Sequence, residues 1–352
     1  MIFTDSFKSI KMNKSVSFLS LAICLFLVVF IYLKNKICVS SINTHSRIIA
    51  ITQIAPHGSL DLIHQGIKDT LKPEILMKEN IKPVEFIFQN AQGSLSTAAQ
   101  IATKFITFNP LIIIPISTPS AQSIYSAAKD SHFFTVFAAV SDPTSAKLLP
   151  SPENPFVTGV SDLPPVEKQA DLIEDILGHL KKNTIGIIYN PGEANAVYLT
   201  QLITKALTHR NFQVIHVTAS NTMGVSTAAQ SLVGKVHAIY LPNDNTVISS
   251  LESVLKTCGI HKIPVFSSDP ESVQRGCLAA IAPDQYALGQ QVGRLVIKLL
   301  KGEHIKNLPI EPSEKNILAI NLETAHTLGM NISPQLIKKA DILIQSFQKR
   351  KS

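Results

Sequence analysis

The sequence of 352 residues contains no tryptophan, and aromatic residues make up only 6% of it. Charged residues are also few, at 16%, and they form no long run of Lys or Arg. A protein that binds single-stranded nucleic acid needs aromatic stacking platforms and a basic groove, so this composition argues against a nucleic-acid partner. With 45% of its positions apolar, the chain is expected to bury a core, and its length predicts two lobes of about 100 to 200 residues each.

The formal net charge of +7 comes largely from the first 46 residues, which carry five lysines and a single acidic residue, Asp5. The remainder has 27 basic and 24 acidic residues, which predicts no surface that tracks phosphates. Residues 16–33 contain no charge, and 18 helical residues span about 27 Å, close to the hydrocarbon thickness of a bilayer. We therefore expect residues 1–46 to contain one hydrophobic helix, which serves as a signal peptide or as a membrane anchor.

The sequence leaves open whether this segment is cleaved, because its apolar stretch is longer than the core of a typical signal peptide. In both cases we expect the body of the protein, from about residue 47 onward, to lie outside the cytoplasm. It would occupy the periplasm or the extracytoplasmic face of the cytoplasmic membrane.

Cysteine is scarce, and two of the four cysteines, Cys24 and Cys38, belong to the leader region. No Cys-x-x-Cys or His-x-x-x-His spacing occurs, so the sequence predicts no zinc or other metal site. Cys258 and Cys277 would form a disulfide in an oxidising compartment, or remain two buried thiols. Of the two, we predict the disulfide.

Signatures of common enzymes are also missing, among them G-x-S-x-G, the P-loop, and a G-x-G-x-x-G after the first apolar run. His57 and Ser59 lie two residues apart on an expected turn and need not face each other. The sequence therefore predicts neither an enzymatic activity nor a cofactor.

From residue 47, short β-branched apolar runs alternate with longer amphipathic stretches. This alternation predicts βαβ units, and hence an α/β protein with two doubly wound parallel-sheet lobes. Residues 148–165 are rich in Pro, Ser and Gly, as expected where the chain crosses between lobes. Near the end, the pattern predicts short strands at 308–310 and 317–320, followed by a helix over 334–347.

Polar residues gather where the expected strands end, and in an open α/β sheet ligands bind outside the carboxyl ends of strands. The candidate ligand-binding residues are Ser59, Gln92, Thr118, Ser120, Asp142, Glu193, Asn195, Asn243, Asp244 and Asp269. Hydroxyl and amide groups dominate the first lobe, and carboxylates the second, which suits a small amino-acid-like zwitterion. The alternative is that these residues are ordinary caps of the helices that follow.

The most specific expectation concerns the role of Asp244. Asp244, supported by Glu193 and Asn195, is expected to anchor the ammonium group of the ligand from the second lobe. Ser59, Thr118 and Asp142 would present the polar contacts of the first lobe.

The loops that follow the expected strands also contain segments that occur, in the same order, in one known family. The matching segments are Thr52-Gln53-Ile54, Asn90-Ala91-Gln92-Gly93, Ser117-Thr118-Pro119-Ser120-Ala121-Gln122, Val140-Ser141-Asp142-Pro143, Val157-Thr158-Gly159-Val160-Ser161-Asp162, Tyr189-Asn190-Pro191 and Pro242-Asn243-Asp244-Asn245-Thr246-Val247. Together they resemble the tryptophan/tyrosine-type family of ABC transporter substrate-binding proteins, and the resemblance runs from about residue 47 to 335.

The resemblance implies a periplasmic-binding fold of type I, in which three crossovers join the two lobes and the helix over 285–301 returns to the first lobe. The implied organisation is a leader at 1–46, a first lobe at 47–158 plus 284–303, and a second lobe at 159–283 plus 304–347.

The function that the resemblance implies is capture of a small amino-acid-like molecule between the lobes and its delivery to an ABC permease in the membrane. A membrane-anchored ligand-sensing domain that works through a partner protein is the alternative. The sequence does not distinguish tryptophan, tyrosine or another ligand.

Overall fold

The computed structural model describes residues 47–128, 133–152, 155–178 and 184–345. The chain divides into two units, residues 1–46 and 47–352. The hydrophobic helix expected within residues 16–33 lies outside the described residues. Within the described part, no helix is long and apolar enough to cross a membrane.

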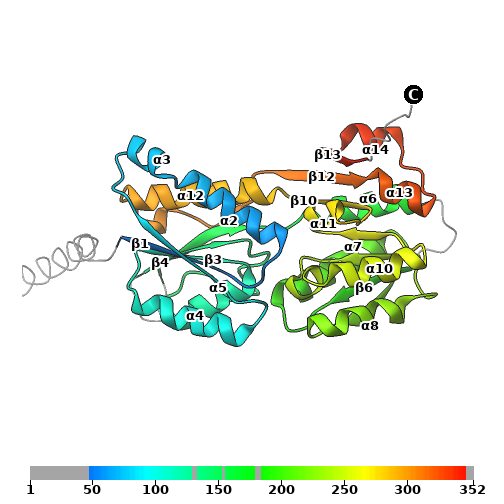
Figure 1. Ribbon diagram of the computed structural model, residues 1–352, viewed down its shortest axis with the longest axis horizontal. Helices are drawn as coiled ribbons and strands as arrows, with labels where there is room; N and C mark the ends of the chain where they lie inside the picture. Colours follow the sequence, from blue (N-terminus) through cyan, green and yellow to red (C-terminus); the bar gives the residue numbers. More distant parts are fainter. Residues whose placement is uncertain (1–46, 129–132, 153–154, 179–183, 346–352) are drawn as a thin grey trace, which may run out of the picture. The chain divides into compact units, whose positions relative to one another are not determined.

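The first lobe is built on a six-stranded sheet in the order β11-β5-β4-β3-β1-β2, and all its described pairings are parallel (Figure 1). Its strands are β1 (Ile48–Gln53), β2 (Glu85–Asn90), β3 (Ile112–Ile116), β4 (Phe134–Ala138), β5 (Val157–Ser161) and β11 (Glu311–Pro312). The inner strands β1 and β3 are buried along almost their whole length, whereas the edge strand β2 is not. Helices cover both faces of a parallel sheet, so a strand with a neighbour on each side is enclosed, whereas the edge strand β2 has a neighbour on one side only.

Helices α2 (Gly58–Thr70) and α12 (Gln285–Leu300) lie side by side on one face of this sheet, and α4 (Leu95–Thr107) and α5 (Thr118–Ala127) cover the other (Figure 1). The short helix α3 (Pro73–Lys78) follows α2.

Glycine permits the close approach of α2 and α12. A Cβ atom added to Gly66 would lie 2.3 Å from the carbonyl oxygen of Tyr286. One added to Gly289 would lie 2.2 Å from the carbonyl oxygen of Ile63. Since these distances are far inside van der Waals contact, a side chain at either position would force the helices apart.

The second lobe contains a seven-stranded sheet in the order β13-β12-β10-β9-β8-β6-β7, in which β10 and β12 are antiparallel and the other described pairings are parallel. Its strands are β6 (Thr184–Tyr189), β7 (Gln213–Thr218), β8 (Ala238–Leu241), β9 (Val265–Ser267), β10 (Ala279–Pro283), β12 (Asn316–Asn321) and β13 (Ile342–Ile344). The two parallel-sheet lobes predicted from the sequence are thereby confirmed.

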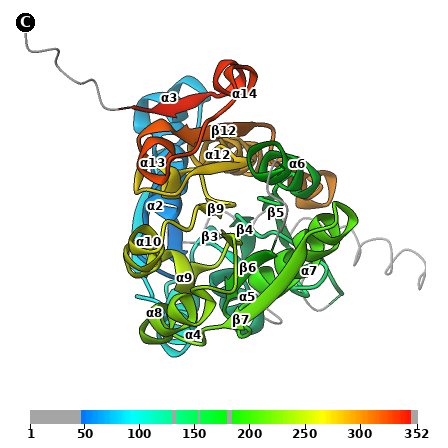
Figure 2. The ribbon, with the colours of Figure 1, turned by 90° about the vertical axis from the view of Figure 1, so that its right-hand side faces the viewer.

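Helices α6 (Val166–Leu177) and α7 (Ala194–His209) lie on one face of the second sheet, and α8 (Thr222–Leu232) and α10 (Leu251–Ile260) on the other (Figure 2). Four short helices complete the lobe: α9 (Asn245–Ile248), α11 (Glu271–Gln274), α13 (Leu322–Leu328) and α14 (Pro334–Lys339).

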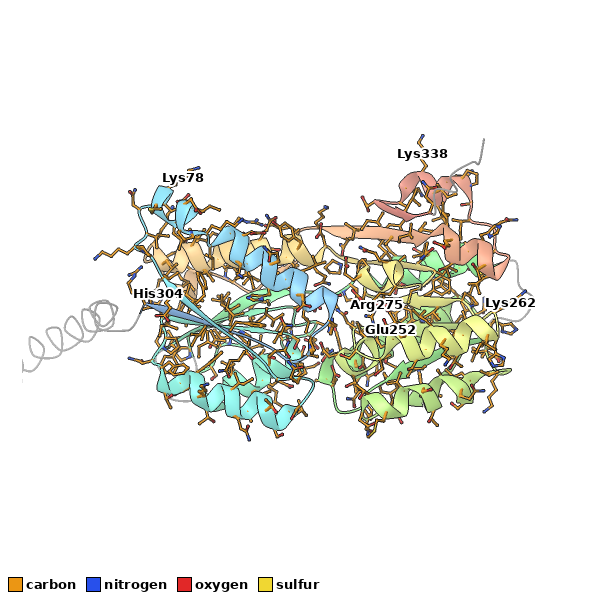
Figure 3. The ribbon with its side chains drawn as sticks, in the orientation of Figure 1. Lys78, Glu252, Lys262, Arg275, His304 and Lys338 are labelled. Carbon is orange, nitrogen blue, oxygen red and sulfur yellow. The ribbon has the colours of Figure 1, made fainter. Side chains whose placement is uncertain are left out.

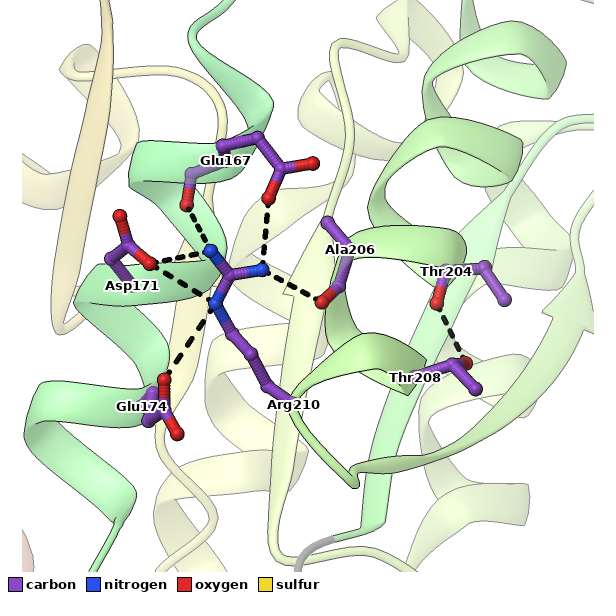
Figure 4. A network of polar contacts seen from close by, with 7 residues as sticks. All are labelled: Glu167, Asp171, Glu174, Thr204, Ala206, Thr208 and Arg210. Atoms are coloured by element: carbon purple, nitrogen blue, oxygen red, sulfur yellow. Dashed lines mark hydrogen bonds and ion pairs between the residues drawn. The ribbon is translucent and has the colours of Figure 1, made fainter.

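Two arginines tie helices of the second lobe together. Arg275, just after α11, donates two hydrogen bonds of 2.8 Å to the carboxylate of Glu252 on α10 (Figure 3). Arg210, at the end of α7, donates to Glu167 and Asp171 on α6, at 2.9 and 2.5 Å (Figure 4). The second contact fixes α6, the helix that follows the first crossing, against α7.

The chain passes between the two sheets three times: from β5 to α6, from β10 to α12, and from β11 to β12. The expected lobe boundaries differ from these crossings. The boundary at 158 falls inside β5, which pairs with β4 as far as Val160. Residues 304–312, expected in the second lobe, end in β11, which pairs with β5 of the first sheet.

The expected helix over 334–347 is wrong, because α14 ends at Lys339 and the apolar residues 342–344 form β13 beside β12. Asp341 supports this turn, since its carboxylate accepts a 2.8 Å hydrogen bond from the backbone N–H of Leu318. Likewise, the short strand expected at 308–310 occurs at 311–312.

The expected disulfide is also wrong, because Cys258 and Cys277 are free thiols. Both are buried in the apolar cluster that α8 and α10 form with the second sheet. Each thiol packs there as a small apolar side chain, which is the common role of an unpaired cysteine.

Candidate functional site

The two lobes meet at the carboxyl ends of their strands. In each sheet the strand order reverses next to the first strand, between β1 and β3 and between β6 and β8. Ligands of open α/β sheets bind at such switch points. Loops from both switch points enclose a cavity of about 20 Å³, which is room for about one water molecule.

The start of α5 forms one wall of this cavity. Ser117 caps the helix with φ 80° and ψ 157°, a backbone region that is otherwise almost restricted to glycine. The hydroxyl oxygens of Ser117 and Thr118 are buried and have no hydrogen-bond partner among the described residues. Together with the positive end of a ten-residue helix, they offer hydrogen bonds to an anionic group.

The loop between β1 and α2 contacts the second lobe directly. His57 Nε2 lies 3.2 Å from Oδ1 of Asn245, and Ser59 donates a short hydrogen bond to Oδ1 of Asp269. Burial lowers the pKa of His57, although the charge of Asp269 acts in the opposite direction. Nδ1 of His57 is buried and finds no partner within the described chain.

Asp244 lines the cavity and is only 2% exposed, but backbone groups occupy both of its carboxylate oxygens. Oδ1 accepts a 2.9 Å hydrogen bond from the N–H of Val247, and Oδ2 accepts one of 2.5 Å from the N–H of Asn190. Burial, followed by the charge of Glu193, raises its pKa well above the ordinary value. Asp244 thus caps α9, which is the alternative that the sequence left open for it.

Glu193 holds the residues that directly follow Asp244 in the chain. Its carboxylate accepts four hydrogen bonds, from the backbone and side chain of both Asn245 and Thr246. It lines, with Gln92, a second cavity of about 340 Å³ that shares Asn245 with the first.

Two further carboxylates reach the first cavity. Asp269, two residues before α11, accepts hydrogen bonds from the N–H and the hydroxyl of Ser272 in that helix, at 3.2 and 2.5 Å. Asp162, in the first crossing, accepts 2.8 Å from the hydroxyl of Ser141 and 2.6 Å from Nδ2 of Asn243. Burial raises the pKa of Asp162 to about 6.

The structure brings together six of the candidates predicted from the sequence, and they line the first cavity: Ser59, Thr118, Asn195, Asn243, Asp244 and Asp269. Four candidates lie elsewhere. Besides Gln92 and Glu193, Ser120 is buried within α5 and does not line the cavity. Asp142 closes a turn by accepting a hydrogen bond of 3.0 Å from the N–H of Thr144.

Other lining residues were not among the candidates, chiefly His57, Ser117, Ser141, Asp162, Asn245 and Gln285. Most of them are neighbours of a candidate in the same loop, so the position of each loop was the signal that could have found them. Asp162 had no such signal, because it lies in the crossing segment and not at an ordinary strand-to-helix corner.

The charge of the lining is one-sided. It contains three carboxylates, from Asp162, Asp244 and Asp269, and none of the described residues that line it is Lys or Arg. Such a lining favours a ligand that carries a cationic group.

The family model for ABC transporter substrate binding proteins matches residues 48–344. The chain belongs to this family. It is 35% identical over 285 residues to a tyrosine-binding protein of Clostridioides difficile, and the match covers 80% of this chain and 81% of that protein. Substrate-binding proteins of this kind are not enzymes; they bind small molecules outside the cytoplasm and work with ABC permeases.

Solved structures agree with this assignment. A domain from Streptococcus pneumoniae in complex with L-Trp superposes with a TM-score of 0.78 at 30% identity, over 84% of this chain and 99% of that one. A substrate-binding protein with adhesive properties from Clostridium difficile, in its ligand-free, open form, gives 0.62 at 31% identity, over 85% and 99%. A conserved domain protein from Vibrio cholerae gives 0.78 at 35%, again over 85% and 99%.

Proposed function

We propose that this protein is the extracytoplasmic binding component of an ABC importer, and that it captures an amino acid with an aromatic side chain between its lobes. The observation that carries the proposal is the cavity at the two switch points. Its walls combine hydroxyl groups at the start of α5 that have no partner among the described residues with three carboxylates, and none of the described lining residues is Lys or Arg. This distribution matches the two charges of a free amino acid.

The contacts between the lobes support a mechanism of opening and closing. Ser59 and His57 of the first lobe reach Asp269 and Asn245 of the second, so these bonds must break when the lobes separate. The similarity is greater to the L-Trp complex than to the open form, at nearly equal identity and coverage. A ligand that touches both lobes would therefore stabilise an arrangement like the one described here.

The proposal that the ligand carries an aromatic side chain rests on two relatives, one named for tyrosine binding and one solved with L-Trp. The second cavity offers about 340 Å³ next to Asn245, which is space that a large ligand side chain would need. Delivery to a permease follows from the family and completes the proposed role.

The absence of tryptophan from the chain makes a direct test possible. Added L-tryptophan is then the only indole fluorophore in the sample, and we expect its emission to shift when the purified full chain is titrated in. L-tyrosine should compete, and both should raise Tm by mass action. Allitol and tagatose, which occur in more distantly related structures, serve as matched non-ligands. Stabilisation by a sugar and by neither amino acid would refute the ligand class.

A further inference from the structure

The carboxylates of the cavity differ in the groups from which they accept hydrogen bonds. An ionised carboxylate can accept about four hydrogen bonds. Those of Asp244 and Asp269 accept backbone N–H groups that begin α9 and α11. Asp162 accepts one side-chain hydrogen bond on each oxygen, and it caps no described helix.

The position of Asp162 is also distinctive. It directly follows β5, where the chain first leaves the first sheet, and it is 4% exposed. Its partners come from both lobes, Ser141 after β4 and Asn243 after β8, and both partners line the cavity. A cation on this carboxylate would lie at the junction of the two lobes.

The unpartnered hydroxyls of Ser117 and Thr118 lie on the wall formed by the start of α5. An α-amino acid carries its ammonium and carboxylate on one carbon, so its two charges need such walls close together. We infer that Asp162 binds the ammonium group of the amino-acid ligand, while the start of α5 binds its carboxylate. This inference rests on the proposed function and assigns the charged contact to a residue other than Asp244.

Proton release is a consequence of this assignment. Since burial raises the pKa of Asp162 to about 6, part of the protein carries a protonated Asp162 in mildly acidic solution. The carboxyl proton must pass to the buffer before the carboxylate can pair with an ammonium. Affinity should fall below pH 6, by about tenfold at pH 5 relative to pH 8.

Other ionisable groups face the same space, and the experiment must separate them. His57 enters from the loop before α2, Asp244 from the loop before α9, and Asp269 from the loop before α11. Glu193 lies behind Asn245. All four remain in Asp162→Asn, so the difference between this variant and the parent isolates Asp162.

The test compares two probes on two proteins by calorimetry at pH 7.5. L-tyrosine carries the ammonium, and 3-(4-hydroxyphenyl)propionate lacks it but keeps the carboxylate and the ring. Asp162→Asn should bind L-tyrosine at least about 30-fold more weakly than the parent, and should bind the analogue within about threefold. The control Asp175→Asn, an exposed position on α6, removes the same charge and should leave both affinities unchanged.

Equal losses for both probes would show that Asp162 only shapes the cavity, and would overturn the inference, as would unchanged L-tyrosine binding. A measurement on the parent protein guards against misfolding of the variant. At pH 6, calorimetry in buffers of different ionisation enthalpy should show release of about half a proton on L-tyrosine binding, and none at pH 8. No release at pH 6 would overturn the inference. If the parent binds neither L-tyrosine nor L-tryptophan, the proposed function fails and the inference fails with it.

Discussion

Ser59 in the first lobe donates a hydrogen bond directly to the carboxylate of Asp269 in the second. Both side chains are buried, and Asp269 at the same time accepts a hydrogen bond from the N–H of Ser272 in α11. The bond therefore joins the first turn of α2 to the start of α11 and exists only while the lobes are together.

Removing this hydroxyl should weaken the closed arrangement. A hydrogen bond is worth about 0.5–1.5 kcal/mol net of hydration, so Ser59→Ala should lower the affinity for L-tyrosine by about 2- to 12-fold. Ser123→Ala is the matched control, because that hydroxyl bonds to Pro119 within the same lobe. Calorimetry that gives equal affinities for Ser59→Ala and the parent would show that the bond does not stabilise closure.

Asp244→Asn separates the capping role from ligand binding. Asn retains one acceptor oxygen but cannot accept on both sides, so one of the N–H groups of Val247 and Asn190 loses its partner. We expect the free energy of unfolding to fall by about 1–3 kcal/mol, while L-tyrosine affinity stays within about threefold. Denaturant unfolding and calorimetry measure the two quantities. A loss of affinity above about 30-fold with unchanged stability would restore the sequence-based assignment of the ammonium to Asp244.

Gly289→Ala should destabilise the first lobe, because the new Cβ would lie 2.2 Å from the carbonyl oxygen of Ile63. Overpacking of this kind costs about 1–3 kcal/mol. Gly259→Ala, within α10, is the control, since no described atom beyond its chain neighbours and the backbone of its own helix lies within 4 Å of its added Cβ. There alanine should stabilise the helix by about 0.5–1 kcal/mol. Equal effects of the two changes on thermal unfolding would contradict the packing described for α2 and α12.

Cys258 and Cys277 should resist thiol reagents in the folded protein. Burial raises the pKa of Cys258 to about 12 and that of Cys277 well above its ordinary value, so both remain protonated at pH 8. The thiolate is the reactive form. Peptide mass spectrometry after iodoacetamide treatment at pH 8 should find both unlabelled in native protein and both labelled in 6 M guanidinium without reductant. Resistance in guanidinium that only a reductant abolishes would indicate a disulfide instead.

Arg210 contacts Glu167, Asp171 and Glu174, which succeed one another along one side of α6 (Figure 4). Arg210→Ala should lower the free energy of unfolding by about 1–2 kcal/mol, because a guanidinium shared among three carboxylates contributes more to stability than a single exposed ion pair. Because the carboxylates are exposed, 1 M salt should reduce this difference. Lys338→Ala, exposed on α14, should change stability by less than about 0.5 kcal/mol. A salt-independent loss would point to packing of the arginine stem.

The sequence allowed the repeating units to be predicted because buried parallel strands and covering helices have different hydrophobic periods. Runs such as Ile112–Ile116 are apolar without interruption and cannot be exposed. The short strands β11 and β13 could not be predicted in the same way. Two or three residues show no period, and their pairing with β5 and β12 depends on contacts far along the chain.

The candidate site was predictable to the level of loops, and less so to the level of roles. Some of the residues expected to bind ligand, such as Thr118 and Asn195, line the cavity, and their binding of ligand stays a prediction. Capping and ligand contact require the same residue types at the same positions, so the sequence could not separate them for Asp244. Asp162 was missed because its surroundings come from two lobes that only the folded chain brings together.

The first lobe begins at β1 but is covered by α12 and extended by β11, which lie more than two hundred residues further along the chain. Ile63 and Ile67 of α2 share their apolar cluster with Leu288 and Val292 of α12. While the chain is being synthesised or threaded through a membrane from its N-terminus, these isoleucines have no α12 to pack against. The first lobe, although it is synthesised first, therefore cannot complete its core until the C-terminal part has been made. A chain that ends before α12 would leave the apolar face of α2 exposed to aggregation, chaperones and proteases.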